Sequence, residues 1–251
     1  NDIRGNETSS FTVNDVYGIN DLEFSIDSEY LFSLGGLPTF RLSAFDWRNE
    51  KELAYMTFET QPGTRISCCP MRSRLFAIYG DIEEDDGLDI PDELSDNKIV
   101  YLRFITLQGC GEDYIFTQVE SEIQDPILSI CWSPREQCIV STTTGLIIVV
   151  DPNTGLIVGE PFDFASFDSS RQNAIALLCT NRYLITSGTS GVVYWLNLDD
   201  FNQTQDLFTK PFDSPIKYEK MFPKDNTMLF ITDNNTLMSI DLDQESHYPI
   251  D

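Results

Sequence analysis

The feature that most constrains this chain is a repeat of about 45 residues. Apolar, strand-like runs of similar composition end at Trp47, Phe104, Val150, Trp195 and Ile240, with spacings of 57, 46, 45 and 45 residues. Each repeat holds four short runs that are rich in Val, Ile, Phe and Tyr and are bounded by Gly, Asn, Asp, Ser and Pro. A fixed period of this length with four strands per unit predicts an all-β protein with one four-stranded sheet per repeat.

The arrangement that such repeats favour is a β-propeller, with five blades visible across residues 1–251. The first strands are predicted at 21–25, 64–68, 127–132, 174–179 and 216–221, and the second strands at 30–35, 75–80, 138–143, 183–188 and 228–232. No segment has a convincing helical periodicity. The fifth unit shows no clear outer strand after Asp243. We therefore expect either a part of a longer protein with a larger propeller, or a five-bladed ring.

The stretch LFSLGGLPTFRLSAFDW, residues 31–47, is predicted to form the second and third strands of the first blade. Gly35 and Gly36 are expected to give the backbone freedom for the turn, and Pro38 to stiffen its exit.

The chain is strongly acidic, with 41 acidic against 16 basic residues and a formal net charge of −25. Such a surface repels phosphate backbones and anionic lipid headgroups, so neither nucleic acid nor membrane is an expected partner. No apolar run approaches the roughly 18 residues that a membrane span needs. Proteins with basic surfaces are the expected partners.

An acidic insertion at 81–97, within the second visible blade, accounts for about eleven extra residues in the longest spacing. It is either a solvated loop or an arm that grips a basic partner. Its nine acids, with no base, are the candidate partner-binding residues: Asp81, Glu83, Glu84, Asp85, Asp86, Asp89, Asp92, Glu93 and Asp96.

Catalytic chemistry is not expected. The single histidine, His247, excludes histidine-rich metal sites and disfavours a Ser-His-Asp or Cys-His arrangement. No nucleotide-binding glycine motif and no CxxC pair is present, and DPNTG at 151–155 lacks the alternating carboxylates of a calcium loop. We predict no catalytic residue, no cofactor and no metal.

Three of the six cysteines occupy similar strand contexts. Cys68, Cys131 and Cys179 each fall in a predicted first strand. We expect them to be buried free thiols, because a disulfide partner would have to lie in another strand.

In its period and in units such as ICWSP, the chain resembles the WD-repeat proteins. In that family the third strand commonly ends in Trp-Asp. Here the pattern is degenerate, with FDW at 45–47, VVD at 149–151 and YWLNLD at 194–199, and the family's Gly-His is absent. The resemblance implies a WD40-like β-propeller that acts as a non-enzymatic scaffold for protein interactions. Because the histidine of the family's Gly-His pair is missing from the repeats, the stability of the blades must come from apolar packing.

SLGGLPTFRLSAFDWRNEKEL, residues 33–53, also resembles the cilia- and flagella-associated WD-repeat proteins that tether inner dynein arms. That resemblance implies a structural adaptor in the cytoplasm and cytoskeleton, at the axoneme of a cilium or flagellum. Its partners would be neighbouring propellers, coiled coils or dynein-associated subunits. Direct contact with tubulin is not expected, because the microtubule surface is itself acidic. The alternative is an acidic propeller that chaperones or recruits a basic client protein.

Overall fold

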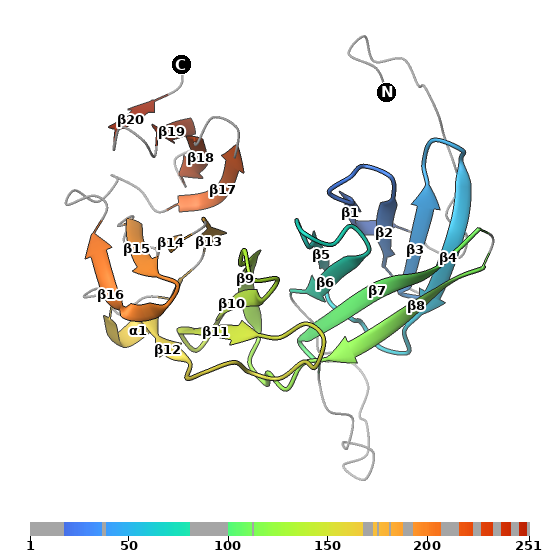
Figure 1. The fold of residues 1–251 in the computed structure, drawn as a ribbon, viewed down its shortest axis with the longest axis horizontal. Coiled ribbons are helices and arrows are strands. Elements are labelled where there is room, and N and C mark those ends of the chain that lie inside the picture. The colour runs from blue at the N-terminus through green and yellow to red at the C-terminus, as the bar shows by residue number, and fades with distance from the viewer. Residues whose placement is uncertain are drawn as a thin grey trace. The chain divides into compact units, whose positions relative to one another are not determined.

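The computed structural model describes residues 18–36, 39–80, 100–111, 113–167, 173–174, 176–180, 182–187, 193–206, 216–222, 227–232, 237–241 and 246–249. Within these residues the strands form five four-stranded antiparallel sheets, each from four consecutive strands (Figure 1). In every sheet the strand order follows the chain, so the first strand forms one edge and the fourth strand the other. The predicted architecture of one sheet per repeat is confirmed.

The chain groups into two compact units. Unit 1 comprises residues 1–124 and 152–156, and unit 2 comprises 125–151 and 157–251. The first sheet of unit 1 contains β1 (Ile19–Phe24), β2 (Leu31–Gly35), β3 (Arg41–Asp46) and β4 (Lys51–Thr57). The second contains β5 (Arg65–Cys68), β6 (Leu75–Tyr79), β7 (Leu102–Cys110) and β8 (Asp113–Glu120).

Unit 2 holds the other three sheets. The third sheet contains β9 (Ile127–Trp132), β10 (Cys138–Thr142), β11 (Leu146–Val150) and β12 (Phe162–Asp163), and the short helix α1 (Phe164–Phe167) follows it. The fourth contains β13 (Ala176–Cys179), β14 (Tyr183–Ser187), β15 (Val193–Asn197) and β16 (Asp200–Asp206). The fifth contains β17 (Ile216–Phe222), β18 (Thr227–Thr232), β19 (Leu237–Asp241) and β20 (Ser246–Pro249).

The strand β20 corrects one expectation. The sequence showed no clear outer strand after Asp243, yet Ser246 pairs with Asp241 and His247 with Ile240. The run is short and polar and holds a proline, so it lacks the apolar alternation that is typical of a strand. A proline is tolerated there because an edge strand leaves one side of its backbone unpaired.

Each unit has its own apolar core between neighbouring sheets. In unit 1 the ring centroids of Phe32 and Phe76 are 4.3 Å apart, and Phe76 meets Phe116 edge-on at 6.1 Å. In unit 2 Phe164 meets Tyr194 edge-on at 5.5 Å, in a cluster that also contains Ile147. Apart from Phe164, which belongs to α1, these side chains lie on the faces of the sheets, so packing between the elements removes them from water.

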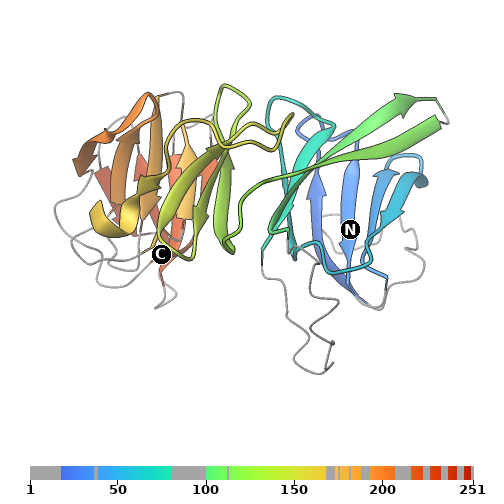
Figure 2. The same cartoon turned by 90° about the horizontal axis from the view of Figure 1, so that it is seen from below.

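The β7–β8 hairpin is longer than predicted. The sequence placed the end of the third strand at Phe104, but β7 continues to Cys110 and pairs with β8 along its whole length. The hairpin lies against β4 of the first sheet (Figure 2). Leu107 is buried in the core of unit 1. Because the hairpin packs against a second sheet, its pairing continues further than the strand length predicted from the repeat.

The turn after β2 departs from its predicted mechanism. Gly36 does not have a positive φ, whereas Phe40, at the start of the third strand, has φ 39°. Pro38 lies outside the described residues. At the other end of β3, the Trp47 indole N–H donates to the Ser28 carbonyl oxygen at 2.8 Å, and its ring meets Phe24 edge-on at 5.5 Å.

A hydroxyl side chain closes the first turn of three sheets, which the sequence analysis missed. Ser25 Oγ accepts the backbone N–H of Tyr30 at 3.0 Å, and Thr180 Oγ1 accepts that of Tyr183 at 3.0 Å. Ser133 Oγ accepts the N–H groups of Arg135 and Gln137, both at 3.2 Å. A Ser or Thr directly after each first strand, at 25, 133 and 180, was the pattern that could have revealed this closure.

All six cysteines are free thiols in the structure. Cys131 is buried as predicted, whereas Cys68 and Cys179 are only partly buried. All three lie in first strands that form sheet edges, β5, β9 and β13, so the place in the sheet does not by itself decide how far each thiol is buried. Across the described ranges, none of the helices has the length and apolar character needed to cross a membrane.

Candidate functional site

The nine acidic residues predicted to bind a partner lie in the connection between β6 and β7, outside the described residues. Their role therefore stays a prediction.

Unit 2 has an open groove where the connection from β11 to β12 faces the turn from β15 to β16. We call it the carboxylate groove; it encloses about 600 Å³. It is lined by Val149, Val158, Gly159, Glu160, Pro161, Phe162, Asp163, Ser166, Leu198, Asp199, Asp200 and Phe201. Four of these residues are acidic, and six supply apolar side chains, which we call the floor of the groove: Val149, Val158, Pro161, Phe162, Leu198 and Phe201.

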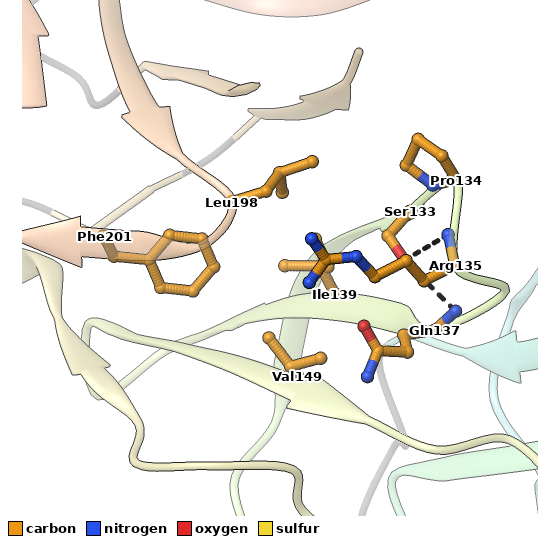
Figure 3. A pocket seen from close by; sticks show the side chains of 8 residues that line it. All are labelled: Ser133, Pro134, Arg135, Gln137, Ile139, Val149, Leu198 and Phe201. Atoms are coloured by element: carbon orange, nitrogen blue, oxygen red, sulfur yellow. Dashed lines mark hydrogen bonds between the residues drawn. The ribbon is translucent and has the colours of Figure 1, made fainter. Parts of the chain in front are cut away.

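The groove continues into a narrow hollow between the third and fourth sheets, shown in Figure 3. Val149, Leu198 and Phe201 line both spaces. The hollow has room of only about 30 Å³, enough for a water molecule or a small group. Ser133 closes the turn on the far side, and this turn carries Arg135 toward Leu198 and Phe201 (Figure 3).

Asp163 and Asp199 each have a specific partner that fixes the position of the carboxylate. Asp163 directly precedes α1 and accepts both the backbone N–H and the hydroxyl of Ser166, at 2.9 and 2.6 Å. These hydrogen bonds lower the pKa of Asp163 below its usual value, so it is ionised at neutral pH. Asp199 pairs with Arg135, and both side chains of this pair are largely exposed, at 70% and 65%. Among the described residues that line these two spaces, four are acidic and Arg135 is the one base, so their summed charge is negative.

Unit 1 has a hollow of about 500 Å³ at the turn ends of its first sheet, with mixed charge. It is lined by Glu29, Tyr30, Asp46, Arg48, Asn49, Lys51, Leu53, Gly111 and Tyr114. Asp46 accepts the side-chain amide of Asn49 at 2.7 Å and its backbone N–H at 3.1 Å, and these bonds lower the pKa of Asp46. Among the described residues that line it, two are acids and two are bases, so their charges balance.

Arg74 holds the β7–β8 hairpin beside this mixed-charge hollow. Its guanidinium donates to the Tyr30 hydroxyl at 2.7 Å and to the Gly109 carbonyl oxygen at 2.8 Å. It also lies over the rings of Tyr30 and Tyr114, at 5.3 and 5.6 Å from their centroids. Burial raises the pKa of Tyr30, which therefore stays neutral and can accept this bond. Arg74 therefore stabilises the packing of the β7–β8 hairpin within unit 1.

No cluster of three or more His, Cys, Asp or Glu side chains suited to a metal ion occurs within the described ranges. The loop DPNTG has a structural function. Asn153 Oδ1 accepts a hydrogen bond from Arg72 at 2.8 Å, and the Gly155 carbonyl oxygen accepts the N–H of Glu122 at 3.2 Å. The loop thereby packs against the end of β8 in unit 1.

Comparison with known proteins defines the fold. No protein-family model and no curated protein matches the chain. Among solved structures, the β-propeller domain of Cps50 (Swd1) from Myceliophteria thermophila superposes with a TM-score of 0.61 at 14% identity, covering 92% of this chain and 72% of that one. The computationally designed protein Ika8 superposes with a TM-score of 0.58 at 14% identity, covering 91% of this chain and 60% of Ika8.

The fold is a WD40-like β-propeller. The repeat-based prediction of an all-β propeller of four-stranded blades is thereby confirmed. At 14% identity the likeness extends to the fold alone, and the chain spans less than two thirds of Ika8. A fold that many proteins share carries function in its surface sites, so function must be argued from the groove and the charge.

Proposed function

We propose that this protein is a non-enzymatic scaffold that binds protein partners through their basic surfaces. The observation that carries the proposal is the carboxylate groove, whose lining combines four acidic residues with apolar side chains. A β-propeller is a rigid platform with loops at the ends of its sheets, a geometry suited to protein docking. The net charge of −25 would accelerate encounter with basic partners and repel nucleic acid and anionic membranes.

Within this class we propose a structural adaptor of the ciliary or flagellar axoneme, associated with dynein tethering. The support is the resemblance of residues 33–53 to the ciliary WD-repeat proteins. The partners would be a neighbouring propeller, a coiled coil or a dynein-associated subunit. Attachment would be indirect, because a strongly acidic domain gains nothing from long-range attraction to an acidic microtubule.

The alternative is a propeller that chaperones or recruits a basic client, and the acidic segment 81–97 together with the carboxylate groove favours it. Such a client would bind with a strong dependence on salt, because exposed charges are screened over about 10 Å at 0.1 M ionic strength.

Fractionation of motile cilia distinguishes the two. An adaptor remains with the doublets after detergent and moderate salt, whereas a client chaperone is absent from purified axonemes. Co-sedimentation of the purified domain with bare microtubules at physiological salt would refute indirect attachment.

A further inference from the structure

We propose that the carboxylate groove binds a linear segment of a protein partner in which a lysine or arginine lies beside an apolar residue. This inference rests on the proposed function as a scaffold for basic proteins. It adds the place of binding and the chemistry of the bound segment.

The floor of the groove accounts for the apolar residue of the segment. Leu198 and Phe201 are only half-buried, and the Phe201 ring lies 5.8 Å from that of Phe162. Val158 on the groove wall is 40% exposed. An apolar side chain laid on these groups would remove their remaining surface from water, which is the general source of affinity in such grooves.

The acidic residues of the groove, which we call its rim, account for the lysine or arginine of the segment. Glu160 and Asp199 are exposed, and Asp200 lines the same space. A lysine or arginine at the rim would therefore meet several carboxylates within one groove, which gives attraction and selects against acidic segments. The mixed-charge hollow of unit 1, with Arg48 and Lys51 beside its acids, lacks this selectivity.

Arg135 already occupies the cation position at one end of the groove. It pairs with Asp199 in the absence of any partner, and both side chains are largely exposed. An exposed ion pair contributes little stability, so a guanidinium or ammonium group from a bound segment can take the place of Arg135 at low cost. Arg135 is therefore a competitor of the proposed ligand, a role that makes a specific prediction.

The probe is a fluorescein-labelled peptide that repeats Gly-Ser-Arg-Leu three times, with binding measured by fluorescence anisotropy on the full chain. Two further peptides carry Glu in place of Arg, or Ser in place of Leu. We expect the Arg-Leu peptide to bind most tightly and to weaken as ionic strength rises above about 0.1 M. Equal binding of the Glu-Leu peptide would overturn the proposal.

The location is tested by two variants with the same change in net charge. Glu160→Gln, Asp199→Asn and Asp200→Asn together should weaken binding about tenfold, from the summed effect of three charges that line the groove. The matched control in unit 1 combines Glu29→Gln, Glu50→Gln and Asp113→Asn, and should change binding by less than about twofold. Equal weakening by both variants would reduce the effect to net charge and overturn the assignment to the groove.

Two single variants test the mechanism. Arg135→Ala should tighten binding of the Arg-Leu peptide by about two- to fivefold, because it releases Asp199. Weaker binding would show that Arg135 supports the site structurally and would contradict its role as competitor. Val158→Ser should weaken the Arg-Leu peptide and leave the Arg-Ser peptide unchanged.

The outcomes separate this inference from the proposed function. If the groove variant binds the Arg-Leu peptide as tightly as the unmodified chain does, the groove is excluded as the binding site. The proposal of a scaffold for basic proteins is then unaffected. Neutralising the nine acids of 81–97 would then test that segment as the site. If no peptide binds even at low salt, the groove proposal fails, and ciliary fractionation decides the proposed function independently.

Discussion

The carboxylate of Glu23 accepts a hydrogen bond from the backbone N–H of Cys68 at 3.0 Å. Two residues earlier on each strand, Asp21 accepts the N–H of Ile66 at 2.7 Å. β1 and β5 are the first strands of neighbouring sheets, so side chains of one sheet satisfy backbone groups at the edge of the next. The edge of β5 is thereby protected by charge-assisted hydrogen bonds that no strand ladder supplies.

Removing either carboxylate should loosen this contact. We expect Asp21→Ala and Glu23→Ala each to lower the free energy of unfolding of unit 1 by about 1–2 kcal/mol, since each leaves a partly buried N–H unpaired. Hydrogen exchange of the Ile66 and Cys68 amides should accelerate. Asp21→Asn, which keeps an acceptor oxygen, should cost less, and exposed Glu59→Ala should leave both amides unchanged.

Cys68 should make the protein less stable at alkaline pH. Burial raises the pKa of its thiol, and the charges of Glu23, Cys69 and Asp21 add to the effect. The unfolded chain releases this proton above about pH 8.5, while the folded chain keeps it. The contribution of the protonated Cys68 thiol to the free energy of unfolding is therefore fully present below about pH 8.5. It is lost as the pH rises, at up to about 1.4 kcal/mol per pH unit. Urea unfolding from pH 7 to 10 should show a shallower decline in Cys68→Ala, and parallel profiles would contradict this origin.

Gly155 should tolerate no side chain. It has φ 74°, and a Cβ there would lie 2.2 Å from the Glu120 carbonyl oxygen. We expect Gly155→Ala to lower the free energy of unfolding by about 3 kcal/mol, from backbone strain and the clash together. Gly159 provides the control, because its φ is 79° and a Cβ there would meet nothing within 4 Å. Gly159→Ala should cost about 1 kcal/mol, and equal effects would show that the clash is relieved by movement of the loop.

Trp47 should act through its indole N–H as well as its ring. Trp47→Phe keeps an aromatic group against Phe24 but loses the bond to the Ser28 carbonyl oxygen. We expect a loss of about 1 kcal/mol, and about 2–3 kcal/mol for Trp47→Ala, in thermal or urea unfolding. An unchanged free energy of unfolding in Trp47→Phe would indicate that water replaces the indole N–H at the Ser28 carbonyl oxygen.

The acidic segment 81–97 should be dispensable for folding. Nine like charges without a base repel one another. Replacing the segment with a short Gly-Ser linker between β6 and β7 should leave the melting temperature within a few degrees, measured by circular dichroism. Loss of the cooperative transition would show that the segment belongs to a sheet or to the core.

The sequence by itself determined the fold class, the five sheets and the positions of the first and second strands and of most third strands, because period and alternation reflect interactions between residues close in the chain. LFSLG and LIIVV become β2 and β11 as predicted, since their apolar side chains need a sheet face wherever the sheet lies. The outer strand β20 escaped this reasoning because edge pairing constrains side chains weakly.

Only the tertiary structure decided the candidate site. Asp163 and Asp199 are 36 residues apart in a chain rich in carboxylates, and nothing local marks them as neighbours. They line one groove because α1, which directly follows the third sheet, packs Phe164 against Tyr194 of the fourth sheet and so brings the two sheets together. The ion pair of Arg135 with Asp199 and the hydrogen bond from Cys68 to Glu23 have the same origin. Contacts between sheets depend on the geometry of packing, which periodicity along one strand does not encode.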